Sequence, residues 1–300
     1  MARYRETGGE HFRAKGGETV EQLLAERMPD AARRTLKQLV EHGRVLVDGS
    51  PARRLDAVVR AGAAVRISPR GSGRTEAPPL PQGLHVVHMD EDIAVVEKPP
   101  GMLTIATERE KRRTAYAYLR EHVKATDPSA KIFIVHRLDR DTSGLLVFAK
   151  TPEAKERLQA DFAARRVDRV YVAAVHGLLE RDEGTLTSYL LESEALKVHV
   201  TNDPSRGVEA VTRYRVVKRG RKFTIVDVSL VTGRKAQIRV QFAAEGHPVA
   251  GDRVYGDKND MIGRLALHAT RLAFTHPRTM RRVQFQSRVP REITRLAEEE

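Results

Sequence analysis

The sequence predicts an α+β protein with a small N-terminal α/β unit and a larger unit rich in β-strands. Three observations favour this class. Residues 68–83 are dominated by Gly, Ser and Pro and lack apolar periodicity, as is typical of a flexible linker. Apolar residues before the linker follow helical spacing, and after it they alternate as in strands at 85–96, 132–149, 169–177, 211–217 and 223–231. We therefore divide the chain into a basic extension, a small domain, a linker and a large domain, at 1–17, 18–68, 69–83 and 84–295.

The composition excludes several classes of protein. The 300 residues carry a net charge of +13, and 40% of them are hydrophobic, which is enough to bury a core. The absence of Cys excludes disulfides, a cysteine nucleophile and thiolate metal sites. No apolar run approaches the roughly 18 residues of a membrane span, and the N-terminus has no apolar signal segment. We expect a soluble, cytoplasmic, monomeric protein that binds a polyanion, which is nucleic acid more often than a membrane.

The small domain has the pattern of two helices followed by a hairpin. Residues 19–28 indicate a first helix, and Asp30 is the expected N-cap of a second helix that ends before Gly43. The alternating run 44–47 and the dipeptide Asp48-Gly49 then indicate a strand and a tight turn. A returning strand is expected at 65–67.

Four cations of the small domain are candidates for RNA binding. Arg33, Arg34 and Lys37 lie outside the apolar stripe of the second helix, and Arg33 and Lys37 share a face because they are four residues apart. Arg44 follows that helix directly. Such a group suits contacts with phosphates, which position RNA without selecting its sequence. The alternative is an ordinary basic helix face in contact with water.

The large domain begins with two apolar runs in residues 84–97, which we expect to form a hairpin. Further on, the apolar run 131–135 leads into a polar loop at 136–144, and a second apolar strand follows. Asp139 lies in this loop beside Arg140, so its carboxylate is held ionised, which suits a nucleophile or base. A plain hydrogen-bonded turn is the alternative. Thr151 is the expected N-cap of a helix that runs to about Arg166.

Several segments resemble the RluA-type RNA pseudouridine synthases. The segment HRLDRDTSGLLVFAK at 136–150 is similar to the long motif H-R-L-D-x-x-T-S-G-L-L-x-x-A-K of that family. Further similar segments follow in the order of the family at 90–101, 170–177, 232–239, 246–256, 265–269 and 272–277. The resemblance covers roughly residues 84–290. It implies the pseudouridine synthase fold, a long mixed, mainly antiparallel bent sheet with flanking helices.

The resemblance also implies a reaction. The family isomerises uridine in RNA by breaking the N-glycosidic bond, turning the uracil and joining carbon-5 to the ribose. This reaction needs no redox chemistry, so we expect no metal and no small-molecule cofactor. The eleven His residues form no ligand motif in the sequence, which agrees with that expectation. The essential Asp of the family corresponds to Asp139, and its first chemical step is left open.

Other site residues follow from the same resemblance. Tyr171 corresponds to the active-site Tyr, although a ring in the core is the alternative. Arg239 is the first candidate for the Arg that pairs with the catalytic Asp, and Arg234 is the second. Arg137 corresponds to the Arg that fills the gap left by the extruded uridine, and a simple phosphate contact is the alternative. Pocket lining or core packing is expected of the two apolar residues Ile238 and Leu267.

Two departures from the family pattern concern the segment 232–239. Ala236 stands where the family has His, and Lys235 stands where Thr or Ser is common. The small domain resembles the RNA-binding module named after ribosomal protein S-four through GRVLVDG at 43–49, with Ala63 where Asp is usual. Because that module is a common companion of synthases that act on the ribosome, large-subunit ribosomal RNA is the first expected substrate and tRNA the second. The competing hypothesis is a non-catalytic RNA-binding or ribosome-assembly factor that keeps the fold.

Overall fold

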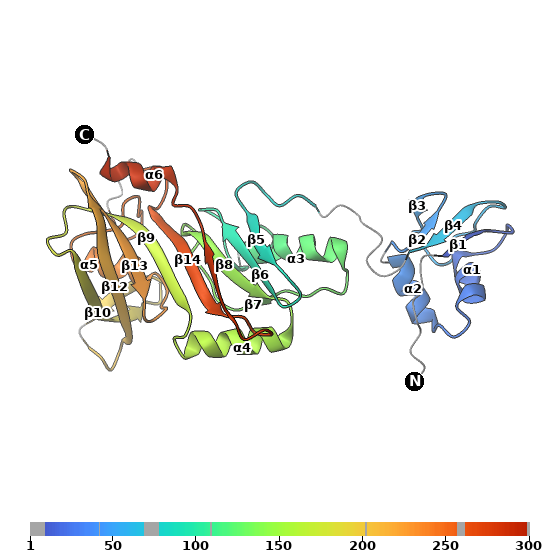
Figure 1. Ribbon diagram of the computed structural model, residues 1–300, viewed down its shortest axis with the longest axis horizontal. Coiled ribbons are helices and arrows are strands. Elements are labelled where there is room, and N and C mark those ends of the chain that lie inside the picture. Colours follow the sequence, from blue (N-terminus) through green and yellow to red (C-terminus); the bar gives the residue numbers. More distant parts are fainter. Residues whose placement is uncertain are drawn as a thin grey trace. The chain divides into compact units, whose positions relative to one another are not determined.

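A computed structural model describes residues 10–41, 43–68, 78–108, 110–201, 203–256 and 262–298 (Figure 1). Its contacts divide the chain into two compact units, one of residues 1–79 with 121–130 and one of residues 80–120 with 131–300. Most of the predicted linker, residues 69–77, and the first nine residues of the predicted extension lie outside the described residues. Within the described ranges, no helix is long and apolar enough to cross a membrane.

The N-terminal unit contains a four-stranded sheet and two helices among its described residues. The strands take the order β1-β4-β2-β3, and all of their pairings are antiparallel. In chain order the elements are β1 (Glu10–Arg13), α1 (Val20–Arg27), α2 (Arg33–Glu41), β2 (Val45–Val47), β3 (Ser50–Pro51) and β4 (Ala64–Ile67). Strand β1 comes from the stretch that the sequence analysis placed in the extension, so this stretch contributes to the sheet.

Local sequence explains the elements of the N-terminal unit. Thr19 caps α1 in a reciprocal capping box with Gln22, which satisfies two free backbone donors. Helix α2 begins at Arg33, which is later than a helix with its N-cap at Asp30 would begin. The reason is that residues 29–31 form a turn. The Asp48-Gly49 turn joins β2 and β3 as predicted, and both residues have positive φ, as a type I′ turn requires.

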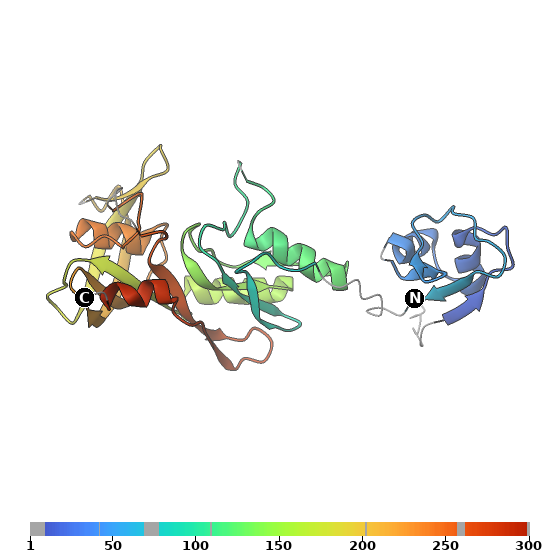
Figure 2. The same ribbon diagram turned by 90° about the horizontal axis from the view of Figure 1, so that it is seen from above.

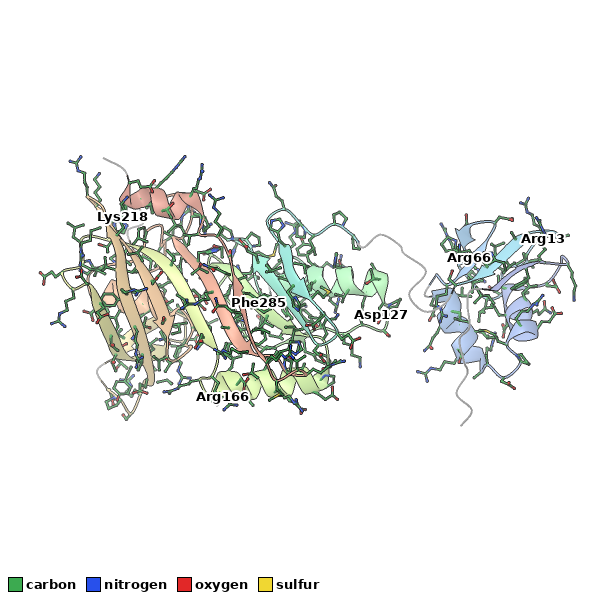
Figure 3. All side chains as sticks on the ribbon, viewed as in Figure 1. Arg13, Arg66, Asp127, Arg166, Lys218 and Phe285 are labelled. Carbon is green, nitrogen blue, oxygen red and sulfur yellow. The ribbon has the colours of Figure 1, made fainter. Side chains whose placement is uncertain are left out.

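The two faces of the N-terminal sheet differ in character. Leu24, Leu36 and Val45 belong to a buried apolar cluster between the helices and the sheet. Arg13 and Arg66 project from β1 and β4 on the exposed side (Figure 3). Strand β4 shows the reason, because its residues alternate between exposed and buried.

The larger unit is built on an eleven-stranded mixed sheet, counted over the described residues, which confirms the predicted α+β class and fold. Nine strands follow the order β11-β10-β12-β13-β9-β14-β8-β6-β5, while β15 pairs with β14 and β7 with β8 (Figure 1). The strands are β5 (His85–Met89), β6 (Ile93–Lys98), β7 (Phe133–Ile134), β8 (Ser143–Ala149), β9 (Asp168–His176), β10 (Glu183–Glu192), β11 (Val198–Thr201), β12 (Val208–Arg219), β13 (Phe223–Leu230), β14 (Leu267–Thr275) and β15 (Arg282–Gln286).

Helices flank this sheet (Figure 2). They are α3 (Ala115–Thr126), α4 (Pro152–Ala163), α5 (Gln237–Ala244) and α6 (Arg291–Thr294), with a 3₁₀ turn at Arg295–Ala297. Thr151 caps α4 by accepting a hydrogen bond from the Ala154 amide, and Pro152 occupies the first turn, as predicted. Leu158 of α4 packs with Val147 of β8 and Phe274 of β14 in an apolar cluster, so one helix fixes two strands that carry the site.

The centre of the sheet positions that site. Strand β14 lies between β9, to which it is antiparallel, and β8, to which it is parallel. Tyr171 of β9, Ala269 of β14 and Gly144 of β8 are consecutive partners across the three strands. The loop that precedes β8 is therefore brought next to Tyr171.

Candidate active site

The polar loop that contains Asp139 is held by the segment that follows β6. Thr104 Oγ1 donates to the carbonyl of Leu138 at 2.8 Å and accepts from the amide of the same residue at 3.1 Å. On the other side of Asp139, the Arg140 guanidinium donates to the carbonyl of Gly101 at 3.1 Å. The backbone is thus fixed on both sides of Asp139, as a reactive group on a rigid platform requires.

A buried lysine supports the same loop from beneath. Lys98 Nζ donates to the carbonyls of Pro99, Met102 and Arg140 at 2.9, 2.8 and 3.0 Å. Its side chain is fully buried. Burial lowers the pKa of Lys98 to about 7, while the carboxylates of Asp141 and Asp139 act in the opposite direction. Lys98 therefore joins the end of β6 to the loop that contains Asp139, at a high desolvation cost.

Gly144 explains how β14 can approach the loop. Its φ is +109°, and a Cβ at this position would lie 2.2 Å from the carbonyl oxygen of Ala269. Only glycine permits this backbone contact between the parallel strands β8 and β14. Beside it, the Ser143 hydroxyl bonds to Nδ1 of the buried His268 at 2.8 Å.

A pocket of about 170 Å³ opens beside Asp139. It is lined by every site residue that the sequence analysis placed in the large domain, namely Arg137, Asp139, Tyr171, Arg234, Ile238, Arg239 and Leu267. These residues come from the Asp139 loop, β9, β14, the first turn of α5 and the segment before α5. The long-range pairing of the sheet therefore brings together residues that are distant in sequence.

The structure places Arg239 beside Asp139. Arg239 Nη1 lies 3.6 Å from Asp139 Oδ2, whereas the Arg234 guanidinium donates to the carbonyl of Glu209 at 3.2 Å. Arg239 also forms a bidentate pair with the buried Asp252, with both N–O distances at 2.7 Å. Of the two candidate arginines, Arg239 thus carries the charge next to the carboxylate.

Tyr171 is buried in β9 and contributes one wall of the pocket. Burial raises the pKa of its phenol, and the charge of Asp139 adds to this effect, while Arg169 opposes it. Ile238 and Leu267 are buried apolar residues of the same pocket, so lining and packing coincide at both positions.

Two residues that precede Asp139 in the loop differ in exposure, because Arg137 is exposed and His136 is partly buried. Arg137 is exposed and lines the pocket. His136 stacks on Phe162 with ring centroids 4.6 Å apart and accepts from the Val147 amide at 3.1 Å. Burial, with a smaller effect of Arg169, lowers the pKa of His136 to about 3. His136 is therefore neutral and supports the loop from the interior.

Comparisons with known proteins agree with this site. The family model for RNA pseudouridylate synthase matches residues 92–244. The chain belongs to the RNA pseudouridylate synthase family. Its activity is that of an isomerase acting on RNA, and the predicted kinship with the RluA-type enzymes is confirmed for the larger unit.

Two curated relatives and one solved structure illustrate the match. The "Uncharacterized RNA pseudouridine synthase YlyB" of Bacillus subtilis is 35% identical over 94% of this chain and 93% of its own. The "Ribosomal large subunit pseudouridine synthase D" of Neisseria meningitidis serogroup A is 32% identical over 93% of this chain and 78% of its own. The solved structure of human RNA pseudouridylate synthase domain containing 4 superposes with a TM-score of 0.59 at 20% identity, over 70% of this chain and 90% of that chain, and shows the shared fold.

The pocket of this synthase contains residues that the sequence analysis did not single out. Arg169 lines it, and its Nε is buried and has no hydrogen-bond partner among the described residues. Its spacing of two from Tyr171 on one strand would have placed both on the same face of the sheet. Ala236, at the position of the family His, is buried, has a φ of +53° and immediately precedes α5.

The four predicted RNA-binding cations of the N-terminal unit are only partly brought together. Arg33, Arg34 and Lys37 line a hollow of about 530 Å³ with Arg53 and Arg54, which the sequence analysis missed. The Arg33 side chain is 78% exposed and pairs with Glu21 at 2.7 Å. Arg44 is not among the lining residues, and its guanidinium donates to the carbonyl of Ser68 at 3.0 Å.

One cluster of ligand-type side chains lies at the β5–β6 turn. Asp90, Asp92 and His276 bring their donor atoms within 4.8 Å of one another, a grouping that the isolated positions of the His residues in the sequence did not predict. Arg278 pairs with Asp92 at 2.6 Å, and Asp90 accepts from two backbone amides. Asp90 and Asp92 are therefore explained as structural carboxylates by the partners that they already have.

Proposed function

We propose that this chain isomerises uridine to pseudouridine in large-subunit ribosomal RNA, with Asp139 as the essential carboxylate. The observation that carries the proposal is a single pocket lined by Asp139, Tyr171 and Arg239. The choice of RNA rests on the relatives named ribosomal large subunit pseudouridine synthase D. A tRNA substrate is the second candidate.

Asp139 is suited to act in its ionised form. Its side chain is 24% exposed, and the nearest cation, Arg239 Nη1, lies at 3.6 Å. The carboxylate thus has a cation beside it and is yet accessible to a substrate. Attack on the sugar, attack on the base and removal of a ribose proton each require this ionised group.

Tyr171 and the apolar residues hold the base in this proposal. The phenol is protonated at neutral pH, since its ordinary pKa is about 10, and burial raises this pKa further. Its ring stacks on the extruded uracil, and its hydroxyl assists proton removal at carbon-5. Ile238 and Leu267 exclude water from the opposite side of the base.

The cationic side chains contact the phosphates of the RNA or replace a base in its base stack. Arg137, exposed beside the pocket, takes the place of the extruded uridine, which offsets part of an unstacking cost of a few kcal/mol. In the N-terminal unit, Arg34, Lys37 and Arg53 contact phosphates from the hollow they share. A cytoplasmic location and a monomeric state remain predictions from the sequence.

The test is pseudouridine mapping on transcripts of large-subunit ribosomal RNA and of tRNA incubated with the protein. Wild type should modify specific uridines in the ribosomal transcript, and Asp139→Asn should modify none while still binding it. Asp182→Asn, an exposed carboxylate paired with Arg219, is the matched control and should act as wild type. Modification by Asp139→Asn at the wild-type rate would refute the role of Asp139. RNA binding without conversion by any form would support the non-catalytic alternative.

A further inference from the structure

The donors of Arg239 are divided unequally between two carboxylates. Nε and Nη2, which form one edge of the guanidinium, donate to the two oxygens of Asp252 at 2.7 Å each. Nη1 faces Asp139 Oδ2 at 3.6 Å, beyond hydrogen-bonding distance. Arg239 therefore forms its strong ion pair with Asp252, although Asp139 is the carboxylate that the proposed function places in catalysis.

Asp252 is itself held rigidly. Its side chain is fully buried, and Oδ1 also accepts from the amides of Val254 and Tyr255 at 2.9 and 3.1 Å. Burial alone would raise the pKa of Asp252, but the hydrogen bonds and charge of Arg239, together with these amides, hold it below its usual value. Asp252 is thus a buried negative charge that Arg239 and two backbone amides hold in place.

Tyr255 covers a face of the same guanidinium. Its ring centroid lies 5.1 Å from Arg239 Cζ, and its hydroxyl accepts from the Val198 amide at 3.1 Å. This contact combines cation–π attraction with a fixed position of the ring. Arg239 is therefore held at its edge by Asp252 and on its face by Tyr255.

We propose that Asp252 is a positioning residue for the isomerisation: it occupies the bidentate edge of Arg239 so that only Nη1 faces Asp139, and Tyr255 supports the same orientation. The inference rests on the proposed role of Asp139. Asp139, Asp252 and Arg239 together carry a net charge of −1. In this arrangement Asp139 keeps its oxygens free for the substrate. Without Asp252, the open edge of Arg239 can turn to Asp139 and hold both of its oxygens in a bidentate pair.

Asp252→Asn keeps the shape of the side chain and removes its charge. We expect the single-turnover rate at saturating enzyme to fall on the order of 100-fold, as for a misplaced catalytic group. The dissociation constant for RNA should stay within about twofold, because Asp252 is buried and faces Arg239. A merely structural role would not separate rate from affinity in this way.

A double-mutant cycle tests whether the effect passes through Arg239. In the Arg239→Met background, Asp252→Asn should lower the rate no further and should restore stability, since it removes an unpaired buried charge. Asp92→Asn is the matched control: Asp92 is also buried and is held by two nitrogens of Arg278, yet it does not line the pocket. It should lower thermal stability and leave the rate of the folded protein unchanged.

The outcomes separate this inference from the proposed function. The positioning role is wrong if folded Asp252→Asn reacts at the wild-type rate. It is also wrong if the rate losses of Asp252→Asn and Arg239→Met multiply in the double variant. Both conclusions hold even when Asp139→Asn is inactive. If Asp139→Asn is active, the proposed function itself fails. If Asp252→Asn does not fold, Tyr255→Leu replaces it in the cycle, with a smaller rate loss that must again vanish in the Arg239→Met background.

Discussion

Two groups of arginines in this protein show how the same side chain serves different purposes. Arg239 in the larger unit is 10% exposed and bound by a buried carboxylate in fixed geometry. Arg33 in the N-terminal unit is 78% exposed and pairs with Glu21 at the surface. A buried ion pair makes each partner costly to remove, whereas an exposed pair contributes little to stability. The buried arginine can orient the carboxylate beside it, whereas the exposed arginine can only add to the positive field of the surface.

The largest expected effect comes from Arg239→Met. It leaves Asp252 buried without its partner, which should cost about 3–5 kcal/mol in the free energy of unfolding. Arg33→Met is the matched change at the surface and should lower the free energy of unfolding far less, because an exposed ion pair contributes little to stability. Urea unfolding of both variants measures the difference, and equal losses would show that burial does not distinguish the two arginines.

Gly144→Ala tests the close approach of β8 and β14. The added Cβ would meet the Ala269 carbonyl at 2.2 Å in a backbone of positive φ, so we expect a loss of about 3 kcal/mol and of activity. Gly246→Ala is the control, because Gly246 also has positive φ but no atom lies within 4 Å of an added Cβ. It should cost only about 1–2 kcal/mol and leave the rate unchanged.

Lys98 should give the larger unit a distinctive pH dependence. Its pKa is about 7 in the folded protein, below the ordinary lysine value of 10.5, so the unfolded chain binds the additional proton between these values. Stability contributed by this group is therefore lowest below pH 7 and rises with pH up to about 10.5. Between pH 7 and 9 the gain should be about 2 kcal/mol in wild type relative to Lys98→Met. Parallel pH profiles of the two proteins in urea unfolding would exclude the shift.

The smallest effects are expected in the N-terminal hollow. Arg34→Ala or Arg53→Ala should weaken RNA binding and reduce the slope of log affinity against log salt by about 1, because each removes one phosphate contact. The single-turnover rate at saturation should not change. Arg44→Ala is the informative comparison, since its guanidinium donates to Ser68 and is not part of the hollow. An equal change in slope for Arg44 would place the phosphates elsewhere.

Local patterns of sequence sufficed where one segment determines its own structure. The hairpin at Asp48-Gly49, the cap at Thr151 and the polar loop around Asp139 all depend on neighbouring residues, and they were predicted correctly. The family resemblance added Tyr171 and Arg239, which local pattern alone left open.

The features that were missed depend on tertiary pairing. Strand β1 is paired at the edge of β4, and β10 is polar over most of its length with only the short apolar run 189–191. Asp252 lies in the segment 246–256 that resembles the family, but nothing in its spacing indicates that it binds Arg239, 13 residues before it. Buried charge pairs of this kind are set by the packing around them.

The parallel pair of β8 and β14 has a consequence for the order of events during synthesis. Strand β14 lies between β8, which follows the Asp139 loop, and β9, which contains Tyr171. It is nevertheless late in the chain, because it begins at Leu267. Pairing across such a separation is slow to form because a long stretch of chain must be closed first. A nascent chain that ends before β14 has the pocket-lining side chains except Leu267, but it lacks the strand that brings them together. Activity would therefore report the completion of folding of the larger unit, after β14 has been synthesised.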